Sequence, residues 1–283
     1  MGKIIAIANQ KGGVGKTTTA VNLCASLAAA EKRTLLVDMD PQANAVSGLG
    51  VDKHGVEISI YEVLLDPNLI DIAIMDTALE YLSLLPANEQ LTGAEIELVT
   101  LDRREFRLKR ALEKIRDRFD YIFLDSPPSL GLLTLNTLTA ADSILIPLQC
   151  EYYALEGLGQ LLETVKLVQN NLNPSLDIEG VLLTMFDRRL KLAKQVVDET
   201  ISYFGDKVYD TIIPRNVKLS ESPSFGKPIL LYDAECQGAQ TYLKLAREVI
   251  QSGKESTGPR TGSIDTADDQ ESRDRGPGDA HPG

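Results

Sequence analysis

Residues 9–18, NQKGGVGKTT, have the types and spacing of a loop that binds phosphate. They follow a short apolar run and precede the stretch AVNLCASLAAA, so we expect a strand, a glycine-rich turn and a helix that opens with Lys-Thr. Gly12, Gly13 and Gly15 place no Cβ in the way of backbone N–H groups that turn inward, and the helix start adds partial positive charge. This segment, called the glycine loop below, is therefore a predicted polyphosphate site.

Two side chains at the end of the glycine loop suit phosphoryl transfer. Lys16 is positioned to reach the outer phosphates, and the hydroxyl of Thr17 is positioned to bind Mg²⁺. Val14 and Thr18 complete the run that we expect to surround the phosphates.

Two apolar runs that end in aspartate are candidates for a carboxylate that faces this metal. LLVDMDPQ contains Asp38 and Asp40, and FDYIFLD ends in Asp125 before two prolines that would stop strand pairing. Ligands of open α/β sheets bind at the C-terminal ends of the strands, so both runs should converge on the glycine loop. Either aspartate alone could be a turn or capping residue. Together with the glycine loop, they predict a metal-assisted site.

Short β-branched runs alternate with longer helical patterns along the chain. Runs such as IIAIA and ILIPL are apolar at consecutive positions, which indicates strands buried on both faces. The predicted strands are Lys3–Ala8, Thr34–Asp38, Leu82–Leu85, Asp120–Asp125, Ser143–Leu148, Ile178–Thr184 and Val208–Ile213, with a further candidate at Ile229–Tyr232. The predicted helices are 16–30, 105–118, 153–170, 191–204 and 237–251. This alternation predicts one α/β domain over residues 1–251, a doubly wound and mostly parallel sheet flanked by helices, as in P-loop NTPases.

Basic residues are dense in the predicted helix 105–118. They alternate with acidic residues and lie opposite an apolar stripe, so we interpret them as a solvated helix face. The stripe consists of Leu108, Ala111, Leu112, Ile115 and Phe119.

Composition limits the possible partners. The 283 residues carry a formal net charge of −12, so the mean field repels nucleic acid and any DNA contact needs a local basic patch. Residues 181–251, with 10 basic and 9 acidic groups, are where such a patch could lie. The final 32 residues, 252–283, hold six Gly, three Pro and one large aliphatic side chain, which predicts a disordered acidic tail.

Cysteine usage and hydropathy indicate a cytoplasmic protein. Cys24, Cys150 and Cys236 are too scattered for a disulfide framework or a zinc site. The sequence has no run of 18 apolar residues and no signal-peptide pattern, so we expect no membrane association.

Five segments together resemble ParA/Soj-type chromosome-partitioning ATPases, over about residues 1–250. They are KGGVGKTT, LLVDMDPQAN, FDYIFLDSPPSLG, LQCEYYALEGL and IPRNVKLSESPSFGKPI. The resemblance identifies the glycine loop as a deviant Walker A motif, whose additional early lysine is matched by Lys11. It implies ATP and Mg²⁺ as cofactors. It also implies an ATP-dependent homodimer in which Lys11 reaches the partner's phosphates and neutralises charge on the leaving group.

The resemblance also implies roles for individual residues. Asp40 matches the carboxylate that orients the attacking water, which makes it a catalytic candidate with Lys11 and Lys16. Asp125 matches the Walker B acid, and Asp38 begins the same motif nearer the metal. Pro214 and Asn216 fall where relatives hold the adenine.

Relatives of this type bind DNA non-specifically as ATP dimers, which implies a basic face. Its candidate residues here are Arg188, Arg189, Lys191, Lys194, Arg215, Lys218 and Lys227. Contacts of this kind release counterions, so binding should ignore base sequence and weaken with salt. The acidic residues Asp187 and Glu221 reduce the net positive charge of these clusters. Residues 188–194 are equally compatible with the solvated start of a helix.

The implied function is chromosome or plasmid partitioning near the nucleoid, with slow hydrolysis stimulated by a ParB-type centromere-binding protein. A competing hypothesis is a MinD-like division-site ATPase, although the acidic tail is unlike that family's basic membrane helix. The sequence is also compatible with a regulator of replication initiation, with an iron–sulfur carrier that would need paired cysteines, and with a nucleotide-binding scaffold that does not hydrolyse ATP.

Overall fold

The computed structural model describes residues 1–151 and 154–255 and contains a seven-stranded sheet. Its strand order is β3-β4-β2-β5-β1-β6-β7, and only the pairing of β3 with β4 is antiparallel. The strands are β1 (Lys3–Ile7), β2 (Thr34–Asp38), β3 (Met75–Asp76), β4 (Leu82–Leu85), β5 (Tyr121–Asp125), β6 (Ser143–Gln149) and β7 (Asp177–Thr184). The predicted doubly wound α/β fold is confirmed.

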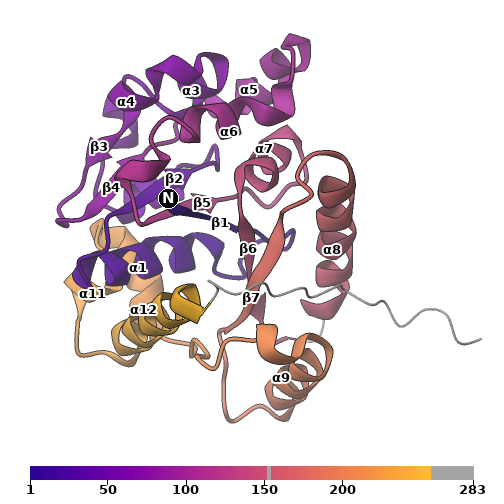
Figure 1. Cartoon of the computed structure of the whole chain (residues 1–283). Coiled ribbons are helices and arrows are strands. Elements are labelled where there is room, and N and C mark those ends of the chain that lie inside the picture. The colour runs from indigo at the N-terminus through magenta and orange to yellow at the C-terminus, as the bar shows by residue number, and fades with distance from the viewer. Residues whose placement is uncertain (152–153, 256–283) are drawn as a thin grey trace, which may run out of the picture.

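Helices cover both faces of the sheet. The α1 and α12 helices pack together on one face, and α6, α7 and α8 follow one another over the other (Figure 1). The helices are α1 (Lys16–Ala29), α2 (Asn44–Gly48), α3 (Ile60–Leu65), α4 (Ile70–Ala73), α5 (Leu91–Glu97), α6 (Arg107–Leu112), α7 (Leu132–Ala140), α8 (Ala154–Asn171), α9 (Lys191–Phe204), α10 (Val217–Glu221), α11 (Ile229–Tyr232) and α12 (Gln237–Glu255). Two short 3-10 turns enter the argument below, η1 (Lys53–Gly55) and η7 (Ser222–Phe225).

Six predicted strands occur where the sequence indicates them, and two predictions are wrong. Residues 208–213 lie beside β7 but form only an isolated bridge, because the amides of Asp210 and Thr211 donate to the carboxylate of Glu248 on α12 instead of continuing a ladder. Residues 229–232 form α11, where Pro228 precedes the first turn and the amide of Ile229 donates to Asn22.

The predicted helix at 105–118 is interrupted, and only residues 107–112 are α-helical. Its apolar stripe is buried, as the spacing indicates. The expected solvated basic face is wrong at two positions. Arg107 donates to the carbonyl oxygens of Leu64 and Leu65 on α3, and Arg116 donates to the Gly2 carbonyl and to Asp142. These guanidinium groups therefore join α6 and the following turn to other elements.

The α7 helix was not predicted, because LLTLNTLTA is buried nearly all round and shows no polar face. The α12 helix ends at Glu255 rather than at residue 251. The domain boundary at 251 stays a prediction, and the rest of the predicted tail, residues 256–283, lies outside the described residues. Over the described part of the chain, no helix combines the length and apolarity needed to cross a bilayer.

We predict that Gly180→Ala destabilises the fold by about 1–3 kcal/mol, because a Cβ there would lie 2.6 Å from the buried ring of Tyr209 and 3.0 Å from the Lys207 carbonyl oxygen. Urea unfolding measures this loss. Gly159→Ala on α8 is the control, since its Cβ meets nothing within 4 Å and should stabilise the helix by up to about 1 kcal/mol. Equal stability of the two variants would contradict the packing argument.

Candidate nucleotide site

Three strand ends lie side by side at the carboxyl edge of the sheet. Ile7 of β1 is in register with Asp125 of β5, and Asp125 is in register with Asp38 of β2. The glycine loop leaves β1 at this edge, so the three segments converge as the sequence predicted.

The glycine loop has the backbone of a phosphate cradle. Gly13 and Gly15 have φ values of 75° and 91°, which residues with a Cβ rarely adopt. A Cβ added at Gly12 or Gly13 would meet nothing within 4 Å, so this side of the loop faces open space. Gly15 also caps α1, whose first amides point toward the same region.

Two buried polar side chains, Asn9 at the start of the glycine loop and Thr184 on β7, fix the path of the loop. Asn9 donates from Nδ2 to the Pro147 carbonyl on β6 at 2.8 Å and accepts from the Lys11 amide at 3.0 Å. Thr184 at the end of β7 donates to the Val14 carbonyl at 2.9 Å. Sequence reasoning assigned neither residue. Asn9 could have been noticed because it opens the motif, whereas nothing in the sequence connects Thr184 to the loop.

The two lysines of the loop lie in different environments. Lys16 is buried, its Nζ donates to the Lys11 carbonyl at 3.2 Å, and burial lowers its pKa against the opposing effects of Asp125 and Asp40. Lys11 is partly exposed, and its Nζ lies 3.6 Å from Oε2 of Glu151, which is itself exposed. An ion pair of this exposure contributes little stability, so Lys11 exchanges partners at low cost.

Asp125 is the best-suited metal ligand among the predicted residues. Both of its carboxylate oxygens are buried without a hydrogen-bond partner among the described residues. Burial and the nearby charge of Asp38 raise its pKa well above the usual range, while the Thr17 hydroxyl and Lys16 oppose the shift. Mg²⁺ prefers oxygen ligands and usually keeps several waters, so one free carboxylate beside a threonine hydroxyl fits this ion. Among the described residues, no three His, Cys, Asp or Glu side chains gather to hold a metal by themselves.

Asp38 organises the loop that carries Asp40. Its oxygens accept hydrogen bonds from the amides of Asp40, Ala45 and Val46, at 3.0–3.2 Å, so it joins the end of β2 to the start of α2. Burial raises its pKa to about 7 despite these donors. Asp40 is nearly buried and accepts from the Gln42 amide at 3.0 Å. Metal binding by Asp38 stays a prediction, and its visible contacts are those of a residue that orders this loop.

One of the two predicted adenine residues, Pro214, lies near the glycine loop, and the other, Asn216, caps α10. Pro214 bridges to Phe186, just after Met185, whose Cε would lie 3.9 Å from a Cβ on Gly15. The side chain of Asn216 accepts from the amides of Lys218 and Leu219 and so caps α10. Its oxygen is therefore occupied by the capping bonds.

Some of the predicted DNA-contacting residues come together and others are already paired. The Arg215 amide donates to the Phe186 carbonyl, which brings residue 215 beside Asp187. Arg189 and Arg215 lower the pKa of Asp187 to about 2, with the Arg189 hydrogen bond the largest cause. Lys218 pairs with Asp233. The remaining candidates, Arg188, Lys191, Lys194 and Lys227, are exposed.

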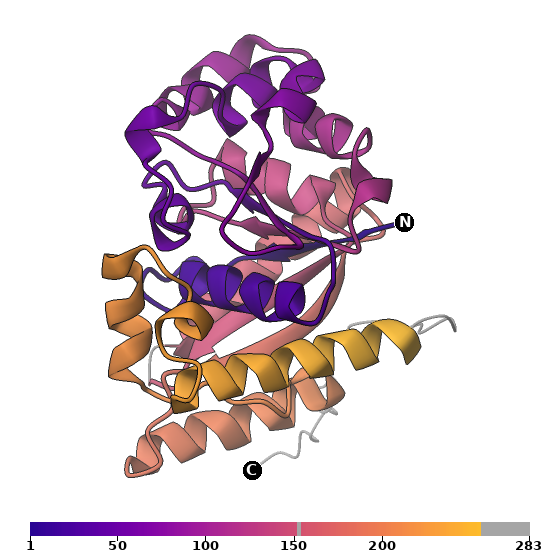
Figure 2. The same cartoon turned by 90° about the vertical axis from the view of Figure 1, so that its left-hand side faces the viewer.

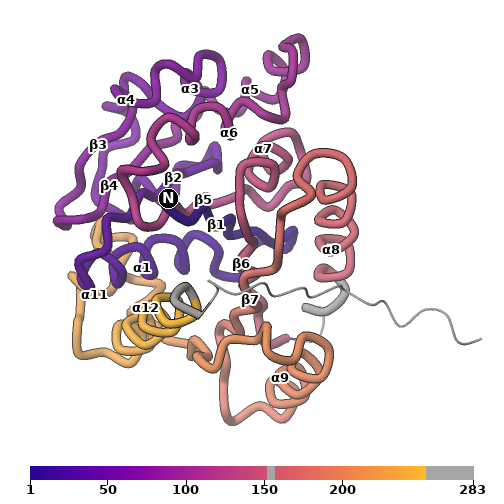
Figure 3. Tube along the Cα trace, in the orientation of Figure 1, coloured from indigo at the N-terminus to yellow at the C-terminus, as the bar shows by residue number. Residues whose placement is uncertain are grey.

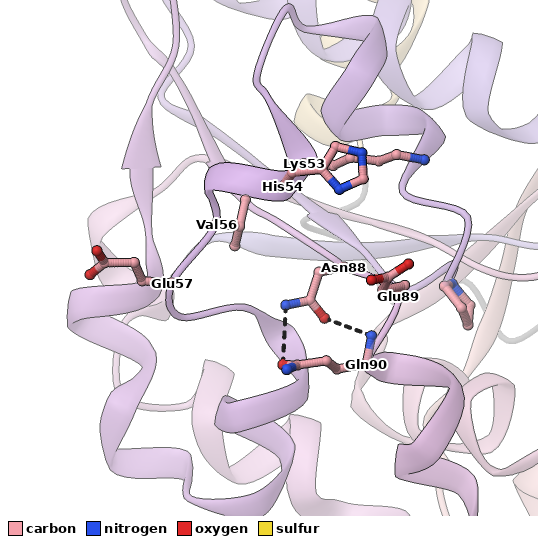
Figure 4. A pocket seen from close by; sticks show the side chains of 8 residues that line it. Lys53, His54, Val56, Glu57, Asn88, Glu89 and Gln90 are labelled. Carbon is pink, nitrogen blue, oxygen red and sulfur yellow. Dashed lines mark hydrogen bonds between the residues drawn. The ribbon is translucent and has the colours of Figure 1, made fainter.

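A polar hollow of about 200 Å³ lies beyond the Asp40 loop and reaches Pro41 (Figure 4). Lys53 and His54 of η1 lie on one side, and Asn88 with Gln90 on the other, where their side chains and the Gln90 amide are hydrogen bonded. No sequence motif pointed to this hollow.

We predict that Asp125→Asn stabilises the nucleotide-free protein at pH 8 by about 1 kcal/mol or more. The raised pKa means that the folded state keeps a proton that the unfolded state loses, so stability falls as the pH rises from about 4 toward the folded pKa. The substitution removes this loss, and its advantage should grow between pH 5 and pH 8. Asp38 also has a raised pKa, so the stability of the Asp125→Asn variant should still fall somewhat as the pH rises.

Urea unfolding at both pH values measures the effect. Asp120→Asn, just before the same strand, is the control, because Arg33 lowers the pKa of Asp120 and its neutralisation should cost stability instead. An Asp125→Asn protein less stable than the parent at pH 8 would contradict the prediction.

Comparison with known proteins agrees with this geometry. A family model described as an AAA domain matches residues 2–178. The chain is 63% identical over 254 residues to the sporulation initiation inhibitor protein Soj of Bacillus subtilis, covering 89% of this chain and 100% of that protein. It is 60% identical over 250 residues to the chromosome partitioning protein ParA of Myxococcus xanthus, covering 88% of each.

The fold also matches a solved structure that contains nucleotide. Cobyrinic acid a,c-diamide synthase from Mycobacterium smegmatis, with bound ATP analog and magnesium, superimposes with a TM-score of 0.79 at 38% identity. The match covers 90% of this chain and 96% of that one. The phosphate cradle, the convergent aspartates and the two full-length relatives lead to one assignment: the chain belongs to the ParA/Soj family of chromosome-partitioning ATPases.

Proposed function

We propose that this protein is a slow ATPase that dimerises on ATP, binds duplex DNA without sequence preference and drives the partitioning of a chromosome or plasmid. The observation that carries the proposal is the register of β1, β5 and β2, which gathers the glycine loop, Asp125 and the Asp40 loop at one edge. These are the parts that phosphoryl transfer needs.

Each residue at this edge has a distinct task in the proposed reaction. The amides of Gly12 to Thr18 surround the phosphates, and Lys16 neutralises charge on them. Thr17 and Asp125 hold Mg²⁺, which supplies charge neutralisation when bound. Asp40 orients the attacking water, and Asp38 fixes the loop that positions Asp40. Pro214 and Asn216 border the adenine.

Lys11 is the residue that makes the second subunit necessary. In one protomer its ammonium pairs loosely with Glu151, and an ATP dimer would bring it to the partner's phosphates. The added positive charge favours the transition state, so a monomer lacking it should hydrolyse ATP slowly. The rate of ATP turnover then depends on dimerisation and on a ParB-type partner, so these two events set how long the ATP-bound state lasts.

The basic segment, residues 215–227, and the neighbouring residues 188–194 form the proposed DNA face. Arg215 is its best candidate because it is exposed and lies beside Arg189 at the same edge as the nucleotide site. A dimer presents two copies of a face that is weak on its own, so binding should require ATP and place the protein on the nucleoid.

The first test removes the proposed water-orienting carboxylate. Asp40→Ala should bind ATP and dimerise as the parent does, because Lys16 and the glycine loop are untouched, but its turnover should fall at least about 100-fold. Phosphate release and sedimentation velocity measure the two properties. Turnover equal to that of the parent would remove Asp40 from the chemistry.

The second test reverses one charge on the DNA face. Arg215→Glu should weaken ATP-dependent binding of arbitrary duplex DNA about 10-fold or more and reduce its salt dependence, with ATP affinity unchanged. Lys32→Glu, at the opposite edge of the sheet, makes the same charge change and should have little effect. Mobility shifts at low and high salt compare them, and identical shifts for both variants would exclude Arg215 from the interface.

A further inference from the structure

Two glycines from distant parts of the chain touch through their backbones. Gly50 follows α2 and Gly226 follows η7, and their φ values of 78° and 61° are both left-handed. A Cβ on Gly50 would lie 2.7 Å from the Gly226 carbonyl oxygen, and a Cβ on Gly226 would lie 2.8 Å from the Gly50 Cα. Neither position has room for a side chain, so the two turns meet directly.

On one side, this contact continues into the nucleotide site. Asp38 accepts from the amides of Ala45 and Val46 and thereby fixes α2 to the end of β2. The amide of Gly50 donates to the Ser47 carbonyl at 3.0 Å, which closes the turn at the other end of α2. The path from Asp38 through Asp40 to Gly50 is therefore one short, hydrogen-bonded unit.

On the other side, the contact continues into the basic segment. The Gly226 amide donates to the Pro223 carbonyl, and the next amide, of Lys227, donates to the Ser222 carbonyl. The amide of Ile229 donates to Asn22 Oδ1 at 2.7 Å, and Asn22 in turn donates to the Thr18 carbonyl. The η7 turn therefore packs against α2, and α11, which follows it, is bonded to α1.

Helix α1 is the common support of both units. Gly48 of α2 packs against Val21, since a Cβ there would lie 3.3 Å from the Val21 Cγ2. The α11 and α12 helices lie along the same side of α1, which the second view and the Cα trace both show (Figures 2 and 3). Helix α1 begins at the glycine loop, and α2, which contacts α1, also contacts η7.

We propose that the Gly50–Gly226 contact couples the Asp40 loop to the basic segment, so that ATP and DNA raise each other's affinity through it. The inference rests on the proposed function, because it requires an ATP-dependent DNA face. Backbone atoms in contact leave no side-chain rotamer to absorb a displacement, so a change of the loop on nucleotide binding reaches Lys227. Thermodynamic linkage then requires DNA to favour nucleotide binding by the same factor.

The coupling factor is the ratio of DNA affinities with and without a non-hydrolysable ATP analogue and Mg²⁺. The parent protein should give a factor of about 5 or more, and the reciprocal measurement, analogue affinity with and without duplex DNA, should agree. In Gly226→Ala and in Gly50→Ala the factor should fall about 3-fold or more, to what dimerisation alone supplies. Analogue affinity in the absence of DNA and analogue-driven dimerisation should both be retained.

Gly205→Ala is the matched control. Gly205 also has a left-handed φ, of 51°, but a Cβ there meets nothing within 4 Å, so this substitution adds backbone strain without disturbing a contact. It should keep the coupling factor of the parent. A reduced factor in this control would attribute the effect to strain and overturn the inference.

The outcomes separate the inference from the proposed function. A coupling factor of about 1 in the parent protein would contradict the proposed ATP-dependent DNA binding itself. A parent that couples, with glycine variants that couple equally well or lose dimerisation, would overturn only the role of the contact.

If neither variant folds, hydrogen exchange on the parent protein decides. Duplex DNA added to the analogue-bound dimer should slow the amides of residues 44–50, and unchanged exchange there would contradict the coupling.

Discussion

The site depends on two carboxylates, Asp38 and Asp125, that parallel pairing buries side by side. Asp38 is satisfied by three backbone amides, whereas Asp125 has no hydrogen-bond partner among the described residues. Their mutual repulsion and burial oppose ionisation, and Lys16 offsets this only in part. Two buried carboxylates with this little compensation are costly to the fold. The proposed cation and nucleotide should therefore stabilise the fold through the same groups.

Around this charged centre, neutral polar side chains hold the backbone. Asn9 and Thr184 tie the glycine loop to β6 and β7, and Asn22 ties α1 to the start of α11. All three are buried, so leaving any of them without its partner would cost a desolvated polar group. The glycine loop can thus keep two left-handed glycines and open amides without help from a ligand, which is the preorganisation that electrostatic catalysis requires.

The basic side chains at the surface are held by ion pairs rather than by buried hydrogen bonds. Lys11 pairs with Glu151, and both side chains are exposed enough for the pair to be weak and readily exchanged. Arg189 holds Asp187 through two nitrogens, and Lys218 pairs with the less exposed Asp233, so these two cations are bound more firmly. With a net charge of −12, the mean field of the protein opposes binding to nucleic acid, so the proposed DNA face must act through its local basic residues.

Local signals determined much of this protein from the sequence alone. The glycine loop, the two aspartate-ended strands and the alternation of buried strands with helices follow from short-range requirements, namely glycine conformations and continuous apolar runs. The pattern of residues 208–213 predicts a strand, but two of its amides donate to the carboxylate of Glu248 instead. The pattern around Arg107 and Arg116 predicts a solvated face, but both guanidinium groups donate to carbonyl oxygens of distant segments. Likewise, nothing local indicates that Asp38 caps α2 or that Gly50 meets Gly226. Those contacts were decided by tertiary structure, because a hydrogen bond or a backbone approach between distant segments depends on how the layers pack and not on the pattern of either segment.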